Sequence, residues 1–535
     1  MVEISVSRPS RLESAAACAL AVVVGLACLT KPLHIDDVLY VRIAQHIARH
    51  PGDPYGGIIN WQHIPTPAYK VSISPPLLNY CFAPFLALGG EPHVVLGAAM
   101  IPWLVLAAWA LLHLGARVTP GGGALALFVL AGPAVVAGTN RMIDVPLLAA
   151  MTAALECAFR YSLGRSRWWL LPCGLLAAAA ALLKYPGLAL VPALLVAAIV
   201  WRKPLLVLPA ILPCLATAWW QWWSQRLYGA GQIAEAGGFL ARFHGVGFAV
   251  YAGRFMQAWA LLAWTCPAWL LAFRRWRSPV LWGATLVGLS LAFLALPPYW
   301  KDSRAISLTT AASGALALGG WCSLAWEAFR RGPSPVAWPA AIWCVSVLGM
   351  TVLAAPFMAV RYYLPLHPWL VLVALPGASI FSRRLVLALT AFAGVAVGYS
   401  DWKWARINPE LIAAVDAKHP GRPMYFGGHW GWQFYAEENG MTAWDARQTQ
   451  LPAGVWLAVP LRADPTPIHP AVYAGARTVD ELASANWSLG LATLWVSPKT
   501  QIGIRLYGGT YPHLPYGFAP GPIERVVILR NLGDP

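Results

Sequence analysis

The chain has 535 residues, of which 58% are hydrophobic and only 11% are charged. A soluble globular protein carries about a quarter charged residues, so this composition excludes an ordinary soluble enzyme and predicts a membrane protein. The formal net charge of +16 could favour nucleic acid, but the basic residues lie between apolar segments, which indicates membrane topology and no nucleic-acid partner.

Thirteen apolar segments divide the chain. A helix that crosses a bilayer needs about 20 mostly apolar residues. The segments predicted to cross are 12–31, 93–113, 122–139, 144–159, 168–183, 186–201, 205–223, 254–273, 279–297, 305–326, 336–356, 364–381 and 385–400. We therefore expect an all-α polytopic membrane protein with about thirteen transmembrane helices.

Basic residues concentrate in alternate connections between these segments. They are Arg117, Arg160, Arg165, Arg167, Arg202, Lys203, Arg274, Arg275, Arg277, Arg330, Arg331, Arg383 and Arg384. Positive charge stays on the cytoplasmic side, so these turns and the N-terminus are expected to face the cytoplasm. The first segment is interpreted as an uncleaved anchor. An odd number of spans then places residues 401–535 outside.

Two long outer segments precede the tail. In the first, 32–92, the stretch Val38–Ala48 has apolar residues at helical spacing and predicts a helix lying on the membrane. The second, 224–253, is rich in glycine and aromatic residues; a lid and a plain connector are both consistent with it.

The tail, 401–535, predicts a small extramembrane α/β domain, distinct from a membrane domain at 1–400. Strands are expected at Pro423–Phe426, Val455–Pro460, Thr493–Val496 and Arg525–Leu529, and a helix at His429–Glu438. This tail contains no cysteine, and the chain has no CxxC metal motif. The scattered His113, His244 and His367 predict no histidine metal pair.

An acidic pair, Asp36-Asp37, follows the first apolar segment on the outer face. A carboxylate at this place could accept a proton from a hydroxyl acceptor. The alternative is that Asp36 caps the helix that begins near Val38. Adjacent side chains point in different directions at a helix start, so only one of the two acids is expected to reach a substrate.

Three further polar positions lie on the same face. Asp144 begins the fourth span, where it is either a second acid of the site or a helix cap. Lys184 interrupts an apolar run and either faces a cavity or snorkels to the interface. Arg361 and Tyr362 precede the twelfth span, as phosphate ligands or as an aromatic-belt anchor. The turn at Lys301, Asp302 and Arg304 is interpreted as solvated.

The shared face makes these positions more informative together than singly. Carboxylates beside cations at an outer interface suit a reaction between a hydroxyl or amine acceptor and an anionic lipid donor. The cations would hold a phosphate leaving group, and an aspartate would act as the base.

The motifs resemble those of the GT-C membrane glycosyltransferases, in particular bacterial relatives of protein O-mannosyltransferases and aminoarabinose transferases. The matching elements are Asp36-Asp37, Pro75-Pro76-Leu77, Asp144-Val145-Pro146-Leu147, Leu182-Leu183-Lys184-Tyr185 and Arg361-Tyr362-Tyr363-Leu364-Pro365. The resemblance covers roughly residues 12–400. Where several relatives carry Lys or His before Pro-Pro-Leu, this chain has Ser74, and Lys70 is the candidate to replace that cation.

The resemblance implies a GT-C-like fold and an inverting transfer of a sugar from a polyprenyl-phosphate-linked donor. The acceptor would be a glycan, lipid or protein of the cell envelope, on the periplasmic face of the bacterial inner membrane. Asp36 would be the base, with Asp37 second, and Asp144 would position the acceptor or Asp36. Lys184, Arg361 and Tyr362 would contact the donor phosphate, and neither a metal nor another cofactor is implied. The alternative is a non-catalytic translocator or binding protein for lipid-linked sugars.

Overall fold

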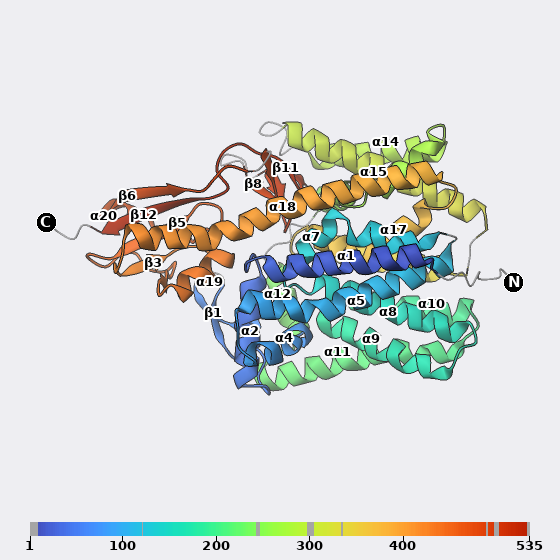
Figure 1. Cartoon of the computed structure of the whole chain (residues 1–535), viewed down its shortest axis with the longest axis horizontal. Coiled ribbons are helices and arrows are strands. Elements are labelled where there is room, and N and C mark those ends of the chain that lie inside the picture. The colour runs from blue at the N-terminus through green and yellow to red at the C-terminus, as the bar shows by residue number, and fades with distance from the viewer. Residues whose placement is uncertain are drawn as a thin grey trace.

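The computed structural model describes residues 9–61, 63–119, 121–241, 247–296, 304–332, 335–487, 490–496 and 502–531. Helices fill most of the molecule, and most strands gather at one end with the C-terminal residues (Figure 1). The first described helix, which begins at Arg11, starts at the opposite end. The charged turn at Lys301 and Asp302 falls outside the described residues.

Six helices in the described part of the chain are long and apolar enough to cross a membrane, judged by length and composition. They are α1 (Arg11–Thr30), α5 (Pro92–Val118), α11 (Val207–Tyr228) with the short turn η4 (Pro204–Leu206) before it, α15 (Arg304–Arg330), α16 (Ala337–Ala354) and α18 (Ile380–Lys418). A seventh span is formed if α13 (Phe248–Thr265) and η5 (Pro267–Arg275), bent by 92°, count as one. This is the pattern of a multi-pass membrane protein.

Several segments expected as single spans are short or broken. Shorter apolar helices are α9 (Leu170–Leu183) after η2 (Arg167–Trp169), α10 (Leu190–Val200) and α14 (Pro279–Ala295). The expected span 122–139 divides into η1 (Gly122–Ala124), α6 (Leu125–Leu130) and α7 (Pro133–Gly138), and 364–381 contains the end of η7 (Val360–Leu366), all of α17 (His367–Ala374) and the start of α18. Pro133 and Pro267 account for two breaks, because proline has no amide hydrogen and clashes with the preceding turn. The expected count of thirteen helices is not confirmed.

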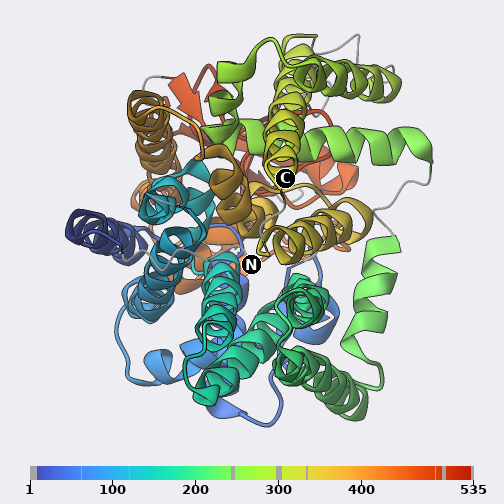
Figure 2. The same cartoon turned by 90° about the vertical axis from the view of Figure 1, so that its right-hand side faces the viewer.

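The helix α8 (Asp144–Ser162) lies in the middle of the helical part, which Figure 2 views roughly along many of its helices. All residues from Asp144 to Phe159 are buried. A helix that is apolar around its whole circumference must be covered on all sides. It packs against α5, α9 and the turn η7 (Val360–Leu366). The N-terminal end of α8 therefore presents Asp144 to neighbouring elements rather than to solvent.

The expected surface helix is present as α2 (Asp37–Arg49), whose buried side includes Val38, Val41 and Ala44. It packs on α4 (Leu77–Ala87). The proline-rich residues between them form the antiparallel pair β1 (Ile58–Asn60) and β2 (Pro65–Pro67), followed by α3 (Ala68–Val71). The segment 224–253 contains α12 (Gln232–Ala241). The helices α4 and α12 contact α9 and α11, respectively, whereas β1 lies near α19 (Figure 1).

The helix α18 connects the helical part to the strands (Figure 1). Its 39 residues make a rod of about 58 Å, whereas the apolar core of a bilayer is about 30 Å thick. The expected division between residues 400 and 401 therefore falls inside a continuous helix. At this point Lys31 pairs with Asp401, and the hydroxyl of Tyr507 donates to Asp401 Oδ2 at 2.5 Å. These buried contacts fasten the tail to the end of α1.

The tail contains a five-stranded sheet in the order β4-β3-β5-β12-β6. Its strands are β3 (Met424–Phe426), β4 (Thr442–Ala443), β5 (Trp456–Pro460), β6 (Ala476–Ala483) and β12 (Arg525–Asn531). The central β5 is parallel to β3 and antiparallel to β12, with Val459 opposite Val527. The helix α19 (Trp430–Glu438) connects the parallel pair β3 and β4. The expected helix and the strands at 423–426, 455–460 and 525–529 are confirmed.

Smaller elements complete the tail. They are α20 (Pro470–Gly475), β7 (Leu491–Ala492), β8 (Leu494–Val496), β9 (Gly503–Arg505), β10 (His513–Leu514) and β11 (Gly517–Phe518). The strand β8 matches the expected strand at 493–496. It pairs antiparallel with β9, which pairs parallel with β10.

The basic connections share two buried glutamates. Arg117 contacts both carboxylate oxygens of Glu156, and Arg160 Nε lies 2.7 Å from Glu156 Oε1. Glu327 pairs with arginines from two other connections, including Arg274 at 3.0 Å. Paired arginines leave less uncompensated charge near the apolar region.

Candidate active site

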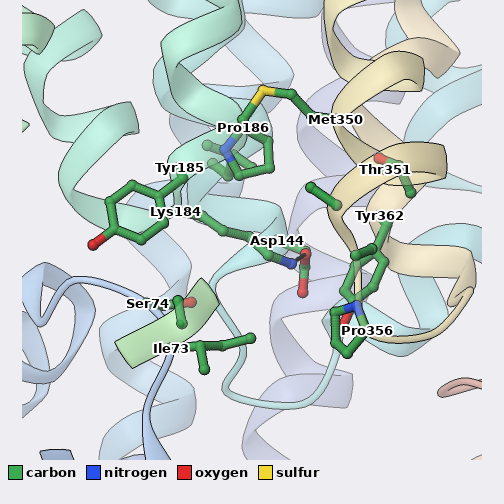
Figure 3. Close-up of a pocket in the computed structure, with 14 residues that line it drawn as sticks. Ile73, Ser74, Asp144, Lys184, Tyr185, Pro186, Met350, Thr351, Pro356 and Tyr362 are labelled. Carbon is green, nitrogen blue, oxygen red and sulfur yellow. Dashed lines mark hydrogen bonds and ion pairs between the residues drawn. The ribbon is translucent and has the colours of Figure 1, made fainter. Parts of the chain in front are cut away.

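The lysine at the end of α9 is positioned by a break in the helix. Pro186 cannot supply the amide hydrogen that a continuous helix would need, so Lys184 adopts an extended conformation between α9 and η3 (Tyr185–Ala189). Gly187 lets the turn pack tightly, since a Cβ there would lie 2.3 Å from the Ala180 carbonyl. The Lys184 side chain points toward the N-terminus of α8 (Figure 3), where its Nζ donates to Asp144 Oδ1 at 2.8 Å.

Arg361 joins two carboxylates that come from different ends of the chain. Its Nη2 donates to Asp36 Oδ2 at 2.8 Å, and its Nε lies 3.6 Å from Asp144 Oδ2. Nη1 contacts the sulfur of Met142 at 2.7 Å. The side chain of Arg361 is 7% exposed and that of Asp144 2%, whereas that of Asp36 is 26% exposed. Of these three residues, Asp36 is the one that a soluble acceptor reaches most easily.

Tyr362 covers both cations. Lys184 Nζ lies 4.1 Å from the centre of the Tyr362 ring, and the guanidinium carbon of Arg361 lies 5.5 Å from it. A cation over an aromatic face is stabilised by the ring quadrupole. Burial raises the pKa of Tyr362 to about 12, so its hydroxyl stays protonated at neutral pH. The ring can hold the cations in place while its hydroxyl remains a donor.

The two carboxylates lie at helix N-termini. Asp36 occupies the N-cap position of α2, and Asp144 is the first residue of α8. The Asp36 side chain makes no capping hydrogen bond, and Asp144 is the first residue inside α8, after the N-cap residue Ile143, so the simple capping alternative does not describe either acid. The partial positive charge of a helix N-terminus favours the ionised form of a carboxylate nearby.

Asp37 belongs to a separate, fully buried pair. Its Oδ1 accepts from the backbone of Arg141 at 2.8 Å, and its Oδ2 accepts from Arg141 Nη1 at 3.2 Å and from the backbone of His34 at 3.1 Å. Arg141 Nη2 also donates to the carbonyl oxygens of Cys28, Lys31 and His93. The bonds to Cys28 and Lys31 satisfy carbonyls at the end of α1 that the helix leaves unpaired, and the bond to His93 reaches the first turn of α5. Asp37 thus holds elements together and does not join Asp36 in one cluster.

A cavity of about 140 Å³ adjoins the cluster (Figure 3). Asp144, Lys184 and Tyr362 line it, together with Ser74 and apolar residues that include Leu147 and Met350. The wall therefore offers a small charged edge and a larger apolar surface. Asp36 and Arg361 are not among the lining residues; Arg361 contacts Asp144 of this edge and in turn holds Asp36.

Gln232 organises another side of the cavity, and the sequence did not single it out. Its amide nitrogen donates to the carbonyl oxygens of Ser72 and Ser74 at 2.9 and 2.8 Å, and its amide oxygen accepts from Tyr185 and Trp220. The buried Gln232 belongs to α12, so the segment 224–253 contributes to this wall. In the sequence, only the richness of that segment in glycine and aromatic residues indicated a possible role for it.

The structure therefore brings together Asp36, Asp144, Lys184, Arg361 and Tyr362, and it separates Asp37 from them. Tyr40 of α2, which is partly buried near Asp36 and Asp144, was not expected at the site. Lys70, the candidate replacement for a cation at Ser74, is exposed and does not line the cavity.

Comparison with known proteins finds only distant matches, and these are among solved structures. No family model and no curated protein matches the chain. Among solved structures, ArnT from Cupriavidus metallidurans in the apo state has 16% sequence identity and a TM-score of 0.37, with 83% of this chain and 92% of that chain covered. The arabinofuranosyltransferase AftD from Mycobacteria has 14% identity and a TM-score of 0.36, with 100% of this chain covered. The chain spans 41% of the AftD length. Both TM-scores lie below 0.5, so the functional argument rests on the residues of this chain.

Proposed function

We propose that this protein is an inverting glycosyltransferase that moves a sugar from a polyprenyl-phosphate-linked donor to a cell-envelope acceptor at the periplasmic face of the bacterial inner membrane. The observation that carries the proposal is the continuous set of contacts Asp36–Arg361–Asp144–Lys184 beside a largely apolar cavity. This arrangement unites a partly exposed acid, two cations and a wall suited to a lipid.

Asp36 is the proposed base. One of its oxygens is held by Arg361, and Oδ1 has no hydrogen-bond partner among the described residues. An ionised carboxylate accepts hydrogen bonds on both oxygens, so Oδ1 is available for the hydroxyl proton of an acceptor. Asp37 has no comparable freedom, because both its oxygens are engaged. This asymmetry supports Asp36 over Asp37.

Lys184 and Arg361 are the proposed ligands of the donor phosphate. Each now shares its charge with Asp144, so a bound phosphate would compete with Asp144 for the two cations. Charge-assisted hydrogen bonds from such groups stabilise the negative charge that develops on a leaving phosphate. Tyr362 would keep both cations oriented through its ring.

The reaction follows from these positions. The acceptor oxygen attacks the anomeric carbon from the side opposite the phosphate, and its proton passes to Asp36. The new carbon–oxygen bond forms as the bond from that carbon to the phosphate oxygen breaks. The polyprenyl phosphate leaves with the bonding electron pair, next to Lys184 and Arg361. Attack from the opposite side inverts the configuration of the anomeric carbon.

A non-catalytic translocator or binding protein would need the cations and the apolar wall but no base. The two functions separate in vesicles that contain the purified protein, polyprenyl-linked lipids extracted from native membranes, and native envelope material as acceptor. A transferase releases free polyprenyl phosphate, which mass spectrometry detects for any sugar, and adds mass to the acceptor. A translocator moves the lipid between leaflets without releasing polyprenyl phosphate, and that result would reject the proposed reaction.

A further inference from the structure

Three side chains from distant parts of the chain converge outside the proposed active site. They are His63, in the turn between β1 and β2, His429, at the start of α19, and Asp464, after β5. Their potential ligand atoms all lie within 4.8 Å of one another, and His429 Nε2 is 2.7 Å from His63 Nδ1. Scattered histidines in the sequence gave no sign of this meeting.

The tautomer of His429 is fixed by its other ring nitrogen. Gln433 donates its amide nitrogen to Glu437 Oε1 at 2.8 Å, and a carboxylate can only accept. The Gln433 oxygen therefore faces His429 Nδ1, 3.0 Å away, and that nitrogen must carry the proton. This leaves a lone pair on Nε2, directed at His63. A partner that orients the second ring nitrogen is typical of histidines that bind metals.

The backbone around the cluster is held in unusual conformations. His63 has φ +64° and Asp464 has φ +45°, in the left-handed region that residues other than glycine rarely adopt. Such strain persists where surrounding contacts impose it, and it collects at functional sites. Here the His429 amide donates to the Ala463 carbonyl at 2.8 Å, and the Ala446 amide donates to the His63 carbonyl at 2.9 Å. The first bond joins the segments of His429 and Asp464, and the second joins the His63 segment to the residues that follow β4.

We propose that His63, His429 and Asp464 bind one divalent transition-metal ion, with zinc as the best match and water at the fourth position. Two imidazoles and one carboxylate with an open place suit zinc in tetrahedral geometry. Zinc lies about 2.0–2.1 Å from its nitrogen ligands, so tetrahedral angles would place the two nitrogens roughly 3.3 Å apart. The rings would need to separate by about 0.6 Å from the present 2.7 Å.

The ion would link the outer segment 32–92 to the tail. Next to it, Arg42 of α2 pairs with Glu437 of α19 at 2.5 Å, so the same two parts already meet there. Without an ion, the close nitrogens are explained by a hydrogen bond from His63 to His429. Asp464 would then serve as a countercharge to Arg505, whose pKa is lowered by burial, an effect that Asp464 partly offsets. The two explanations differ in whether metal is retained and in what Asp464 contributes.

The test uses the full chain in detergent, purified with a tag that contains no histidine and dialysed after one equivalent of Zn²⁺ is added. We expect about one zinc per chain by elemental analysis, and visible absorption bands of tetrahedral Co²⁺ when cobalt replaces zinc. Removing a ligand in His63→Gln or Asp464→Asn should weaken zinc binding more than ~100-fold, and Gln433→Ala should weaken it about 10- to 100-fold. A chelator should lower the unfolding midpoint of the wild type but not of His63→Gln.

The control is His469→Ala, because His469 is an exposed histidine of the same tail. It should retain zinc and the cobalt bands like the wild type. The proposal is wrong if the wild type loses its zinc on dialysis, or if cobalt gives only the weak spectrum of an octahedral aquo ion. Equal zinc loss in His469→Ala and His63→Gln would also overturn it, since binding would then be adventitious.

Discussion

Arg361 and Asp36 are 325 positions apart in the sequence, and in the structure Arg361 Nη2 donates to Asp36 Oδ2 at 2.8 Å. The bond brings a turn late in the helical part against the beginning of α2. It holds one carboxylate oxygen of Asp36 and leaves the other open. Asp37, the next residue, faces away and is held by Arg141. Two neighbouring acids thus have opposite environments, and most of the predictions follow from that difference.

Asp37→Asn should destabilise the protein, whereas Asp36→Asn should not. Removing one partner of a fully buried ion pair leaves Arg141 without its countercharge, which costs about 3 kcal/mol or more. Asp36 is partly exposed, and Arg361 keeps Asp144 as a partner, so we expect a loss of about 1 kcal/mol or less. Denaturant unfolding of both variants in detergent measures the difference, and equal losses would contradict the separate roles.

Lys184→Met should weaken the binding of polyprenyl phosphate while the fold is kept. Methionine preserves much of the side-chain length and removes the charge, and a hydrogen bond to a charged group contributes about 1.5–3 kcal/mol. The dissociation constant should rise about 10- to 100-fold. Polyprenyl phosphate is a suitable probe because it needs no knowledge of the sugar.

Lys70→Met is the matched control for Lys184. Lys70 lies in the outer segment but is exposed and away from the cavity. We expect it to leave polyprenyl phosphate binding unchanged. If Lys70→Met weakened binding as much as Lys184→Met, the phosphate would have to sit elsewhere, near the segment that precedes Pro75.

Arg361→Lys should impair both binding and transfer although it keeps the positive charge. The guanidinium reaches Asp36 and Asp144 from different nitrogens, and one ammonium cannot reproduce both contacts in the same plane. We expect a loss of about tenfold or more in transfer per unit of bound donor, because Asp36 is no longer held in place. A variant with wild-type rates at saturating donor would show that Arg361 does not orient Asp36.

Acid should destabilise the protein through His34. Its ring is buried against Trp404, and burial lowers its pKa from 6.5 to about 3. Between these values the unfolded chain binds a proton at His34 that the folded chain does not, so the contribution of His34 to stability falls as the pH falls below 6.5. From pH 7 to pH 5 the loss is about 2 kcal/mol. His34→Gln should remove that part of the pH dependence. If the unfolding free energy of this variant changed with pH as steeply as that of the wild type, the prediction would be wrong.

The sequence predicted local structure well where the pattern was strong. The helix α2 and the strands β3, β5 and β12 were expected, because apolar spacing and flanking glycine or proline determine them locally. The membrane helices were less predictable. Hydropathy cannot distinguish a crossing helix from one interrupted at Pro133 or Pro267, since both are apolar throughout.

The cluster of Asp36, Asp144, Lys184 and Arg361 could be expected as neighbours from topology alone, because each lies at the same end of a predicted span. The sequence could not predict which of the two adjacent aspartates faces this cluster, because that depends on the distant Arg141. The role of Gln232 and the contact between His63 and His429 could not be predicted from the sequence either. They depend on loops that fold together, and no periodic pattern marks such loops.

The most direct test of the central claim compares binding and chemistry in Asp36→Asn, with Asp53→Asn as control, because Asp53 lies in the same outer segment and its replacement can still accept from Tyr228. We expect Asp36→Asn to bind polyprenyl phosphate within about twofold of the wild type while transfer from native donor lipids falls about 10²- to 10⁴-fold. Asp53→Asn should transfer normally. Unchanged transfer by Asp36→Asn would contradict the account.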